Sequence, residues 1–248
     1  MATKPIPTER SSRARNRIHT AALRLFAENG GGTISVSDLA DAAGIARGTI
    51  YNNIIDPKNL LGEVASALSE EMLLRTEATM QAFTDPAERV ATGLRLFVRR
   101  AHEEQDWGRF LTQFTLSHAT LRGIMHEPPS RDIAQGIETG RFKIASAQIP
   151  AFVAMLTGTT ISAMNSVIRG EQTWRDAGSN AAELLLRAAG ISAAEARRIA
   201  TKELPPLAAE QEATKRKSRR KHEHDQDRGH RPRALRRARP GGDEGLSS

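Results

Sequence analysis

The sequence predicts an all-α protein in which an N-terminal three-helix unit with a helix-turn-helix motif precedes a helical bundle. Apolar residues recur at three- and four-residue spacing through most of the 248 residues. Aromatic residues make up only 4% of the chain, and no alternating apolar run with a hairpin turn is present. Residues typical of helix starts and glycines typical of helix ends separate the periodic stretches. Each feature favours helices over strands.

The positive charge is concentrated at the two ends of the chain, whose net charge is +7. Residues 1–60 hold eight basic and five acidic residues, residues 61–204 hold sixteen and seventeen, and residues 205–248 hold twelve and seven. This distribution predicts an N-terminal piece that faces a polyanion, a nearly neutral body and a basic tail. The chain has no cysteine, which excludes disulfides, thiolate zinc sites and cysteine nucleophiles.

No signal peptide or membrane span is expected, because we find no apolar run of the required length and the N-terminus is polar. We therefore expect a cytoplasmic protein. The first helix is predicted from the stripe Ile18, Ala22, Leu25 and Phe26, which ends at three consecutive glycines. A second stripe runs from Leu60 to Met72.

Helix caps predict the elements of the body. Asp85-Pro86-Ala87-Glu88 begins a helix, because an acidic N-cap precedes a proline at the first helical position. Ser130 is expected to begin a short helix that Gly140 ends. The remaining helices are expected over about 146–169, over 174–189 before Gly190, and after the capping sequence Ser192-Ala193-Ala194-Glu195.

The segment Ser37–Tyr51 contains the parts of a helix-turn-helix motif. Ala40 is small where two helix backbones would approach closely, and Gly44 suits the positive φ of a tight turn between helices. The apolar positions that would face each other across the motif are Leu39, Ala43, Ile45 and Ile50.

Residues 12–61 resemble the N-terminal domain of the TetR/AcrR family of transcriptional regulators. The segments that carry the resemblance are Ala21–Gly30, Ser35–Ala40, Gly44–Tyr51, Lys58 and Leu60. Gly136–Phe142 and the long helix after it resemble the family's regulatory half more loosely, so the resemblance covers roughly residues 12–205. It implies a three-helix DNA-binding domain, a connecting fourth helix and an all-helical domain for dimerisation and ligand binding.

The resemblance also implies the DNA-contacting residues. Ser35 and Ser37 fall at the start of the second helix, where a serine can meet a phosphate, cap the helix, or do both. Tyr51 either meets a phosphate or is a half-buried structural aromatic. Three departures from the family pattern are Ala46, Ile54 and Pro57, and the last puts the role of Lys58 in question. The full expected set is Ser35, Ser37, Arg47, Gly48, Thr49, Tyr51, Asn52 and Lys58.

Two further surfaces are expected in the regulatory half. The helices near 146–169 and 173–189 would form the homodimer interface, because the first carries small residues at close spacing; the alternative is an intramolecular core helix. Those small residues are Ala151, Ala154, Gly158, Ala163 and Ser166. A patch of aromatic, histidine and methionine side chains would either line a pocket for a small effector or belong to an ordinary core. It comprises Trp107, Phe110, Phe114, His118 and Met125.

No cofactor, metal site or enzymatic motif is expected, apart from a weak His222-Glu223-His224 pattern in the tail. The tail has twelve basic residues between Lys215 and Arg239 and almost no large apolar ones, which predicts disorder. It would add DNA affinity, bind RNA or an acidic partner, or serve as a solubilising extension.

The domain prediction is a flexible arm at 1–11, the DNA-binding domain at 12–58, the ligand-binding and dimerisation domain at 59–206, and the tail at 207–248. The predicted function is a homodimeric, ligand-responsive repressor that binds a palindromic double-stranded DNA operator. The alternative is a sequence-tolerant, nucleoid-type or helical interaction protein that uses its basic ends.

Overall fold

The computed structural model describes residues 9–28, 34–53, 60–115 and 119–209, and within these ranges every regular element is a helix. This confirms the predicted all-α class. The first four helices are α1 (Glu9–Glu28), α2 (Val36–Ala43), α3 (Arg47–Asn53) and α4 (Leu60–Thr79). They are followed by α5 (Pro86–Glu103), α6 (Gln105–Thr115), α7 (Ala119–Glu138), a 3₁₀ turn at Ser146–Gln148, α8 (Ile149–Ile168), α9 (Trp174–Ala188) and α10 (Ala193–Ala200).

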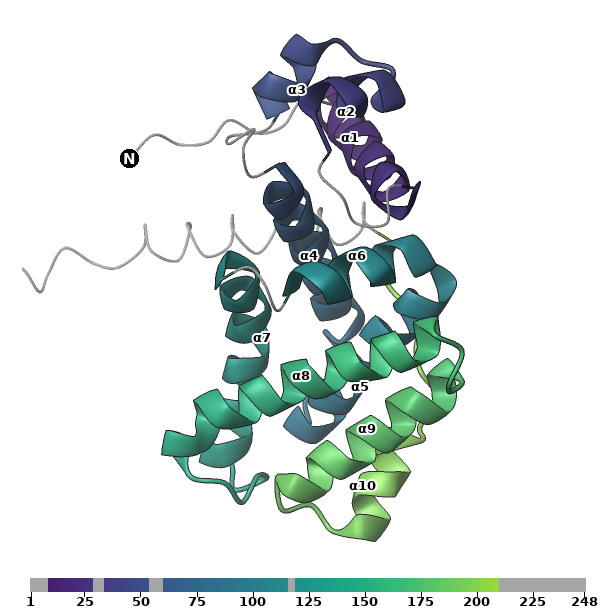
Figure 1. Cartoon of the computed structure of the whole chain (residues 1–248). Coiled ribbons are helices and arrows are strands. Elements are labelled where there is room, and N and C mark those ends of the chain that lie inside the picture. Colours follow the sequence, from purple (N-terminus) through teal and green to yellow (C-terminus); the bar gives the residue numbers. More distant parts are fainter. Residues whose placement is uncertain (1–8, 29–33, 54–59, 116–118, 210–248) are drawn as a thin grey trace, which may run out of the picture.

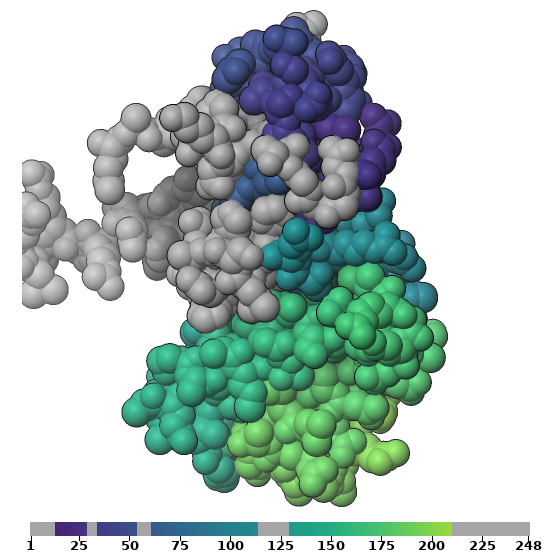
Figure 2. Space-filling model, viewed as in Figure 1, coloured from purple at the N-terminus to yellow at the C-terminus, as the bar shows by residue number. Residues whose placement is uncertain are grey.

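Helices α1, α2 and α3 form a small unit with its own apolar centre. Ile18, Phe26, Leu39 and Ile50 are almost fully buried there, each at 4% exposure or less. The four side chains come from all three helices, so each helix depends on the other two to bury its apolar face. In Figures 1 and 2 this unit stands as an upper lobe above the teal and green helices of the body.

The turn between α2 and α3 is fixed by backbone geometry and by α1. Gly44 has φ 59°, the left-handed conformation that the sequence predicted. Arg17 Nη2 donates a hydrogen bond of 2.6 Å to the carbonyl oxygen of Gly44, and Arg24 Nη2 donates one of 3.3 Å to that of Ala42. The two arginines of α1 therefore satisfy the carbonyl end of α2, where the helix dipole also favours cations.

The body is arranged around α5, which packs against α8, α9, α7, α6 and α10. Asp85 caps α5 as predicted, because its carboxylate accepts from the backbone N–H of Ala87 at 3.0 Å. The same carboxylate accepts two hydrogen bonds of 2.9 Å from Arg141, whose Nη2 also donates to Glu195 at the start of α10. Arg141 therefore ties the loop after α7 to the N-terminal ends of α5 and α10.

The prediction that a helix begins at Ser130 is wrong. Helix α7 begins at Ala119 and continues through Pro128 and Pro129 to Glu138. Two prolines normally end a helix, because each removes an N–H donor and clashes with the preceding turn. Here α7 packs against α4, α8 and α5, and this tertiary packing outweighs the local preference. Its end agrees with the prediction, since Gly140 has φ 68°.

Helix α8 meets the length and composition of a membrane-spanning helix over Ser146–Ile168. Half of its apolar window is buried within the fold, against α5, α7 and α9. This is the pattern of a core helix that also keeps one uncovered face. Small and hydroxyl residues divide the large apolar residues of this helix, so the sequence contains no uninterrupted run of large apolar residues there.

The α1–α3 unit meets the body through α4 and α6. Phe26 of α1 and Phe110 of α6 form an edge-to-face pair with ring centroids 5.0 Å apart and an interplanar angle of 79°. Phe110 is fully buried. This aromatic pair, together with the contact of α1 with α4, is the joint between the two regions.

Candidate nucleic-acid interface and effector cavity

The exposed face of α3 holds most of the predicted DNA-contacting residues. Ile50 is fully buried and anchors this short helix to the unit. Tyr51 is 54% exposed, which leaves both of its predicted roles open. A side chain at Gly48 would meet nothing within 4 Å, so the backbone of α3 is open to a close approach there. The other members of the face are Arg47 and Asn52, which are exposed, and Thr49, which is partly buried.

Helix α2 precedes α3 in the chain, and a capping box caps its N-terminal end. The Ser35 hydroxyl accepts from the backbone N–H of Asp38 at 3.1 Å, and the Asp38 carboxylate accepts from the backbone N–H of Ser35 at 3.2 Å. The pKa of Asp38 is lowered by its hydrogen bonds from Ser35. Ser35 therefore caps α2 and is also exposed, while Ser37 is partly buried. Lys58 lies outside the described residues.

A cavity lies between α4, α5, α7 and α8 and contains about 620 Å³ of empty space, including its opening to solvent. Its walls are mainly apolar. Gly93 on α5 also lines it, facing Thr76 and Met80 at the end of α4. The larger apolar side chains of the wall are Leu73, Met80, Val90, Leu94, Phe97 and Leu156.

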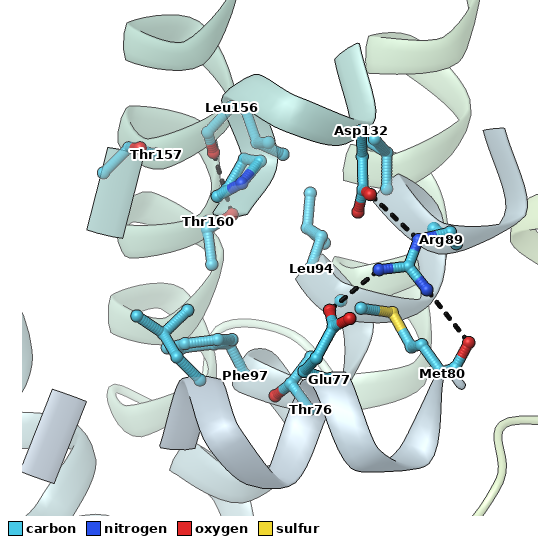
Figure 3. Close-up of a pocket in the computed structure, with 14 residues that line it drawn as sticks. Thr76, Glu77, Met80, Arg89, Leu94, Phe97, Asp132, Leu156, Thr157 and Thr160 are labelled. Carbon is cyan, nitrogen blue, oxygen red and sulfur yellow. Dashed lines mark hydrogen bonds and ion pairs between the residues drawn. The ribbon is translucent and has the colours of Figure 1, made fainter. Parts of the chain in front are cut away.

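A buried charge cluster forms one side of the cavity (Figure 3). Arg89 donates to Asp132 at 2.9 Å, to Glu77 at 2.8 Å and to the carbonyl oxygen of Met80 at 3.0 Å. Burial alone lowers the pKa of Arg89, but the hydrogen bond and charge of Asp132, followed by those of Glu77, outweigh burial and raise it. The guanidinium is therefore charged and fixes both carboxylates at the cavity wall.

The opposite side of the cavity carries threonines. Thr157 and Thr160 of α8 line it, and the Thr160 hydroxyl donates to the Leu156 carbonyl oxygen at 2.8 Å. Thr76 of α4 lines the cavity next to Glu77, and its hydroxyl is buried without a hydrogen-bond partner in the part of the chain that the structure describes. An unpaired buried hydroxyl costs roughly 1–3 kcal/mol, so it is a candidate for a hydrogen bond from a bound molecule.

Of the patch singled out in the sequence, the two residues whose side chains the structure describes, Trp107 and Phe110, are not among those lining this cavity. Trp107 and Phe110 are buried at 1% and 0% exposure and belong to the core. Trp107 packs against Phe97, which does line the cavity, at a centroid distance of 6.1 Å, and the Arg100 guanidinium lies 4.4 Å from the Trp107 ring centroid. Trp107 therefore contacts a residue of the cavity wall, Phe97, without being part of that wall. His118, and the side chains of Phe114 and Met125, lie outside the described residues.

Sequence reasoning missed the polar residues of the cavity. Arg89 and Asp132 are charged residues next to the apolar positions Val90 and Ile133, which pointed to the core. The sequence did hold a signal for these polar residues, namely a charged residue beside a stripe of buried apolar positions. Charged side chains are rarely buried without a partner, so such a position suggests an ion pair in the core. Among the described residues, no group of three or more histidine and carboxylate side chains is placed to hold a metal ion.

A helix-turn-helix unit with an exposed α3, joined to a helical body that contains a cavity, is the architecture of a DNA-binding regulator. The family description "Bacterial regulatory proteins, tetR family" matches residues 18–53, and "Tetracyclin repressor-like, C-terminal domain" matches residues 85–202. The chain belongs to the TetR family and is a DNA-binding transcriptional regulator. No curated protein sequence gives a significant match.

Solved structures agree with the family assignment. RolR in complex with resorcinol is 32% identical, with a TM-score of 0.63 over 81% of this chain and 99% of RolR. RolR without ligand is 33% identical, with a TM-score of 0.56 over 78% of this chain and 100% of that one. FadR from Bacillus subtilis in complex with stearoyl-CoA shares the fold at 21% identity, with a TM-score of 0.60 over 71% of this chain and 99% of FadR.

Proposed function

We propose that this regulator is a homodimeric repressor that binds a palindromic operator and releases it when a small hydroxylated aromatic molecule fills the α4–α5–α7–α8 cavity. The observation that carries the proposal is the cavity itself, whose apolar walls hold fixed carboxylates and an unpaired hydroxyl. One of its walls is α4, the helix that follows the DNA-binding unit in the chain.

The DNA contacts are proposed for α3 and the start of α2. Arg47 and Thr49 would reach base edges or phosphates, and Gly48 would let the backbone approach the DNA. Tyr51 and Asn52 extend the same exposed face, and Ser35 and Ser37 would meet a phosphate at the start of α2. Lys58 would add a phosphate contact beyond it. A single unit of this size makes few contacts, so two copies reading two half-sites are expected.

The proposed dimer interface is the uncovered face of α8 and α9. Met155 and Leu184 are 39% and 62% exposed, which marks them as apolar side chains without a covering element. Small residues surround Met155 on α8, and a Cβ at Gly158 would meet nothing within 4 Å. This open, apolar surface supports a close helix contact between two copies. Of the small residues expected at this interface, Ala151, Ala154 and Gly158 are exposed, whereas Ala163 is buried and Ser166 is partly buried; Ser162 is also exposed.

The effector chemistry is proposed from the cavity walls. An aromatic ring would pack against Phe97 and Leu94, and its hydroxyl groups would donate to the carboxylates of Glu77 and Asp132. The Thr76 hydroxyl would gain the partner that it lacks. RolR, which is 32% identical, has been solved with resorcinol, a ring with two hydroxyl groups, and this supports the same class of ligand here.

The release mechanism needs only a difference in affinity. A ligand shifts the spacing of the two DNA-binding units if it binds the DNA-incompatible arrangement more tightly than the compatible one. Because α4 both lines the cavity and contacts α1, a small displacement of α4 would change the position of the α1–α3 unit.

Footprinting on genomic DNA tests the operator proposal. We expect a short protected palindrome, and we expect Arg47→Ala to weaken binding to it at least tenfold, with a smaller loss for Tyr51→Phe. Arg198→Ala on α10 is the matched control, because this arginine is 59% exposed and belongs to another face. Equal affinity for random and protected DNA would contradict the proposal and favour a sequence-tolerant DNA-binding protein.

Titration with resorcinol, phenol and benzene tests the effector proposal, with release of labelled operator as the measurement. Resorcinol is expected to release the operator at the lowest concentration and benzene at the highest, because only hydroxyl groups can satisfy the carboxylates. Thr76→Val should raise the required resorcinol concentration several-fold, whereas the exposed Thr139→Val should not. An unchanged response in Thr76→Val would remove Thr76 from the site.

A further inference from the structure

Gly93 lies in the interior of α5 without a backbone reason to be glycine. It is not among the glycines with positive φ, and α5 continues without a break from Pro86 to Glu103. A glycine inside a helix makes a protein less stable than an alanine would, because glycine loses more conformational freedom on folding. The helix itself therefore gains nothing from the glycine at this position.

Packing against the other helices does not require the glycine either. A Cβ atom at Gly93 would lie 3.8 Å from both Thr76 Cγ2 and Met80 Sδ, an ordinary contact distance, with no nearer atom among the described residues. Two other helix glycines differ from it. At Gly108 a Cβ atom would lie 2.9 Å from side chains of α5 and α8, and at Gly136 it would lie 2.2 Å from an aromatic ring. Alanine would therefore fit at Gly93, whereas close packing requires glycine at the other two positions.

The space beside Gly93 is part of the cavity. Gly93 lines the cavity together with Arg89 and Phe97, which lie about one helical turn before and after it on α5. Figure 3 shows Arg89 and Phe97 on opposite sides of the cavity. This row of α5 is charged at one end and aromatic at the other, and at Gly93 only backbone lies between them. Thr76, whose hydroxyl is unpaired, borders this bare stretch.

The surroundings of Gly93 suit a flat ring. Because no side chain projects from Gly93, a planar group can lie directly on the α5 backbone. The thioether of Met80 and the ring of Phe97 line the same cavity, and both groups make favourable contacts with aromatic rings. A saturated ring of the same size is puckered and carries hydrogens on both faces, so it needs more room between the helices. A methyl group at Gly93 would occupy that room.

From this geometry we propose that Gly93 is a specificity-determining residue of the cavity, which keeps a slot open for a planar aromatic ring and disfavours saturated rings. The inference rests on the effector binding proposed above and names what the cavity selects. Glycine at this position lowers the stability of α5 and keeps the binding space open. A residue that lowers stability without a structural need is typical of a functional site.

Gly93→Ala tests this inference because it separates stability from binding. The ligand-free variant should unfold about 2–4 °C higher than wild type, since alanine favours the helix and fits the site. Its affinity for the operator in the absence of ligand should be unchanged. Its Kd for resorcinol in isothermal titration calorimetry should rise about tenfold, because one methyl group is added to a packed pocket. Gly108→Ala is the matched control, and it should unfold at a lower temperature than wild type.

A pair of diols tests the preference for planar rings. Resorcinol and cis-1,3-cyclohexanediol carry hydroxyl groups at the same ring positions, but only resorcinol is flat. Wild type should bind resorcinol about tenfold more tightly than the saturated diol. In Gly93→Ala this ratio should fall toward one, because the methyl group closes the slot to both rings. The concentrations that release labelled operator should follow the same order.

Three results would overturn this inference and leave the effector proposal in place, provided that resorcinol still releases the operator from wild type. One is a lower unfolding temperature for ligand-free Gly93→Ala, which would show that packing needs the glycine. The second is an unchanged Kd for resorcinol in Gly93→Ala. The third is equal affinity of wild type for the two diols. Failure of wild type to bind resorcinol at all would instead count against the effector proposal, and the role of Gly93 would fall with it.

Discussion

The α1–α3 unit and the α4–α10 body place their functional groups in opposite ways. In the unit these groups are exposed on the seven residues of α3 and at one capped helix start, over a small apolar centre. In the body they are buried, drawn from four helices, and linked by charges such as Arg89 with Asp132. Exposed side chains of α3 can therefore be exchanged at little cost to the fold, whereas a change in the cavity wall also disturbs buried packing.

Phe110, in the joint between the two regions, is fully buried and lies neither on the exposed face of α3 nor in the wall of the cavity. Phe110→Ala should lower the free energy of unfolding by about 3–5 kcal/mol, because it empties a fully buried site. It also removes the edge-to-face pair with Phe26. We expect urea unfolding followed by far-ultraviolet circular dichroism, which reports the helices of both regions, to change from one transition to two as the unit separates from the body.

Arg197→Ala is the control for this change, because Arg197 is exposed on α10 and its truncation should alter stability by less than about 0.5 kcal/mol. A loss of stability in Phe110→Ala with a single sharp transition would show that the two regions remain coupled through α4 alone.

The difference between the regions also explains what the sequence could predict. The helix-turn-helix depends on local signals: Ser35 caps α2, Gly44 takes positive φ, and the apolar Leu39 and Ile50 are buried as expected. Each signal lies within about fifteen residues of the others. The exposed face of α3, which we propose as the DNA-contacting surface, could be located from the sequence because α3 is a single short helix with one buried side.

The cavity could not be predicted in this way. It is a space left between four helices, and such a space follows from their packing and from small residues such as Gly93. The aromatic pattern led to Trp107 and Phe110, which fill the core instead. Helix α7 shows the same limit, because its passage through Pro128 and Pro129 depends on contacts with other helices.

The joint is also expected to respond to pH. Burial and the charge of Arg15 lower the pKa of His19 to about 4, although Glu71 of α4 acts in the opposite direction. The unfolded chain therefore binds a proton between about pH 6.5 and pH 4 that the folded chain excludes. The contribution of His19 to the free energy of unfolding is therefore fully present above pH 6.5, and up to about 3 kcal/mol of it is lost as the pH drops to 4.

Urea unfolding at several pH values measures this effect. His19→Gln should remove most of the loss between pH 6.5 and pH 4, whereas the exposed His102→Gln should leave it unchanged. An identical pH profile for wild type and His19→Gln would show that other groups carry the dependence.

In the body, the electrostatic tie is the pair of charge-assisted contacts that Arg141 makes with Asp85 and Glu195, and it is farther from the DNA-binding unit. Arg141→Gln should lower stability by about 2 kcal/mol, because it removes charge-assisted bonds to Asp85 and Glu195. Operator affinity should not change while the protein is folded. Arg169→Gln, at an exposed position, is the control in thermal unfolding.

The acid response of this tie differs from that of His19. Burial raises the pKa of Asp85, but the hydrogen bonds and charge of Arg141 outweigh this and lower it, and Arg141 likewise lowers the pKa of Glu195. The contribution of these two carboxylates to the free energy of unfolding is present above about pH 4 and is lost as the pH falls through their lowered pKa values. Arg141→Gln should therefore flatten the profile only below about pH 4, and flattening above pH 5 would contradict this assignment.

The smallest effect separates the two roles of Ser35. Ser35→Ala should cost about 1 kcal/mol, because it removes the α2 cap, and Thr173→Ala should cost a similar amount at the α9 cap in the body. Ser35→Asp keeps a good capping group but places a negative charge where we propose a phosphate. Because Ser35→Asp also places a second carboxylate beside Asp38, we expect it to lose about as much stability as Ser35→Ala but to bind the operator several-fold more weakly than Ser35→Ala, while Thr173→Ala binds normally. Wild-type operator affinity in Ser35→Asp would leave Ser35 with capping alone, and the reading face would then consist of α3 without the start of α2.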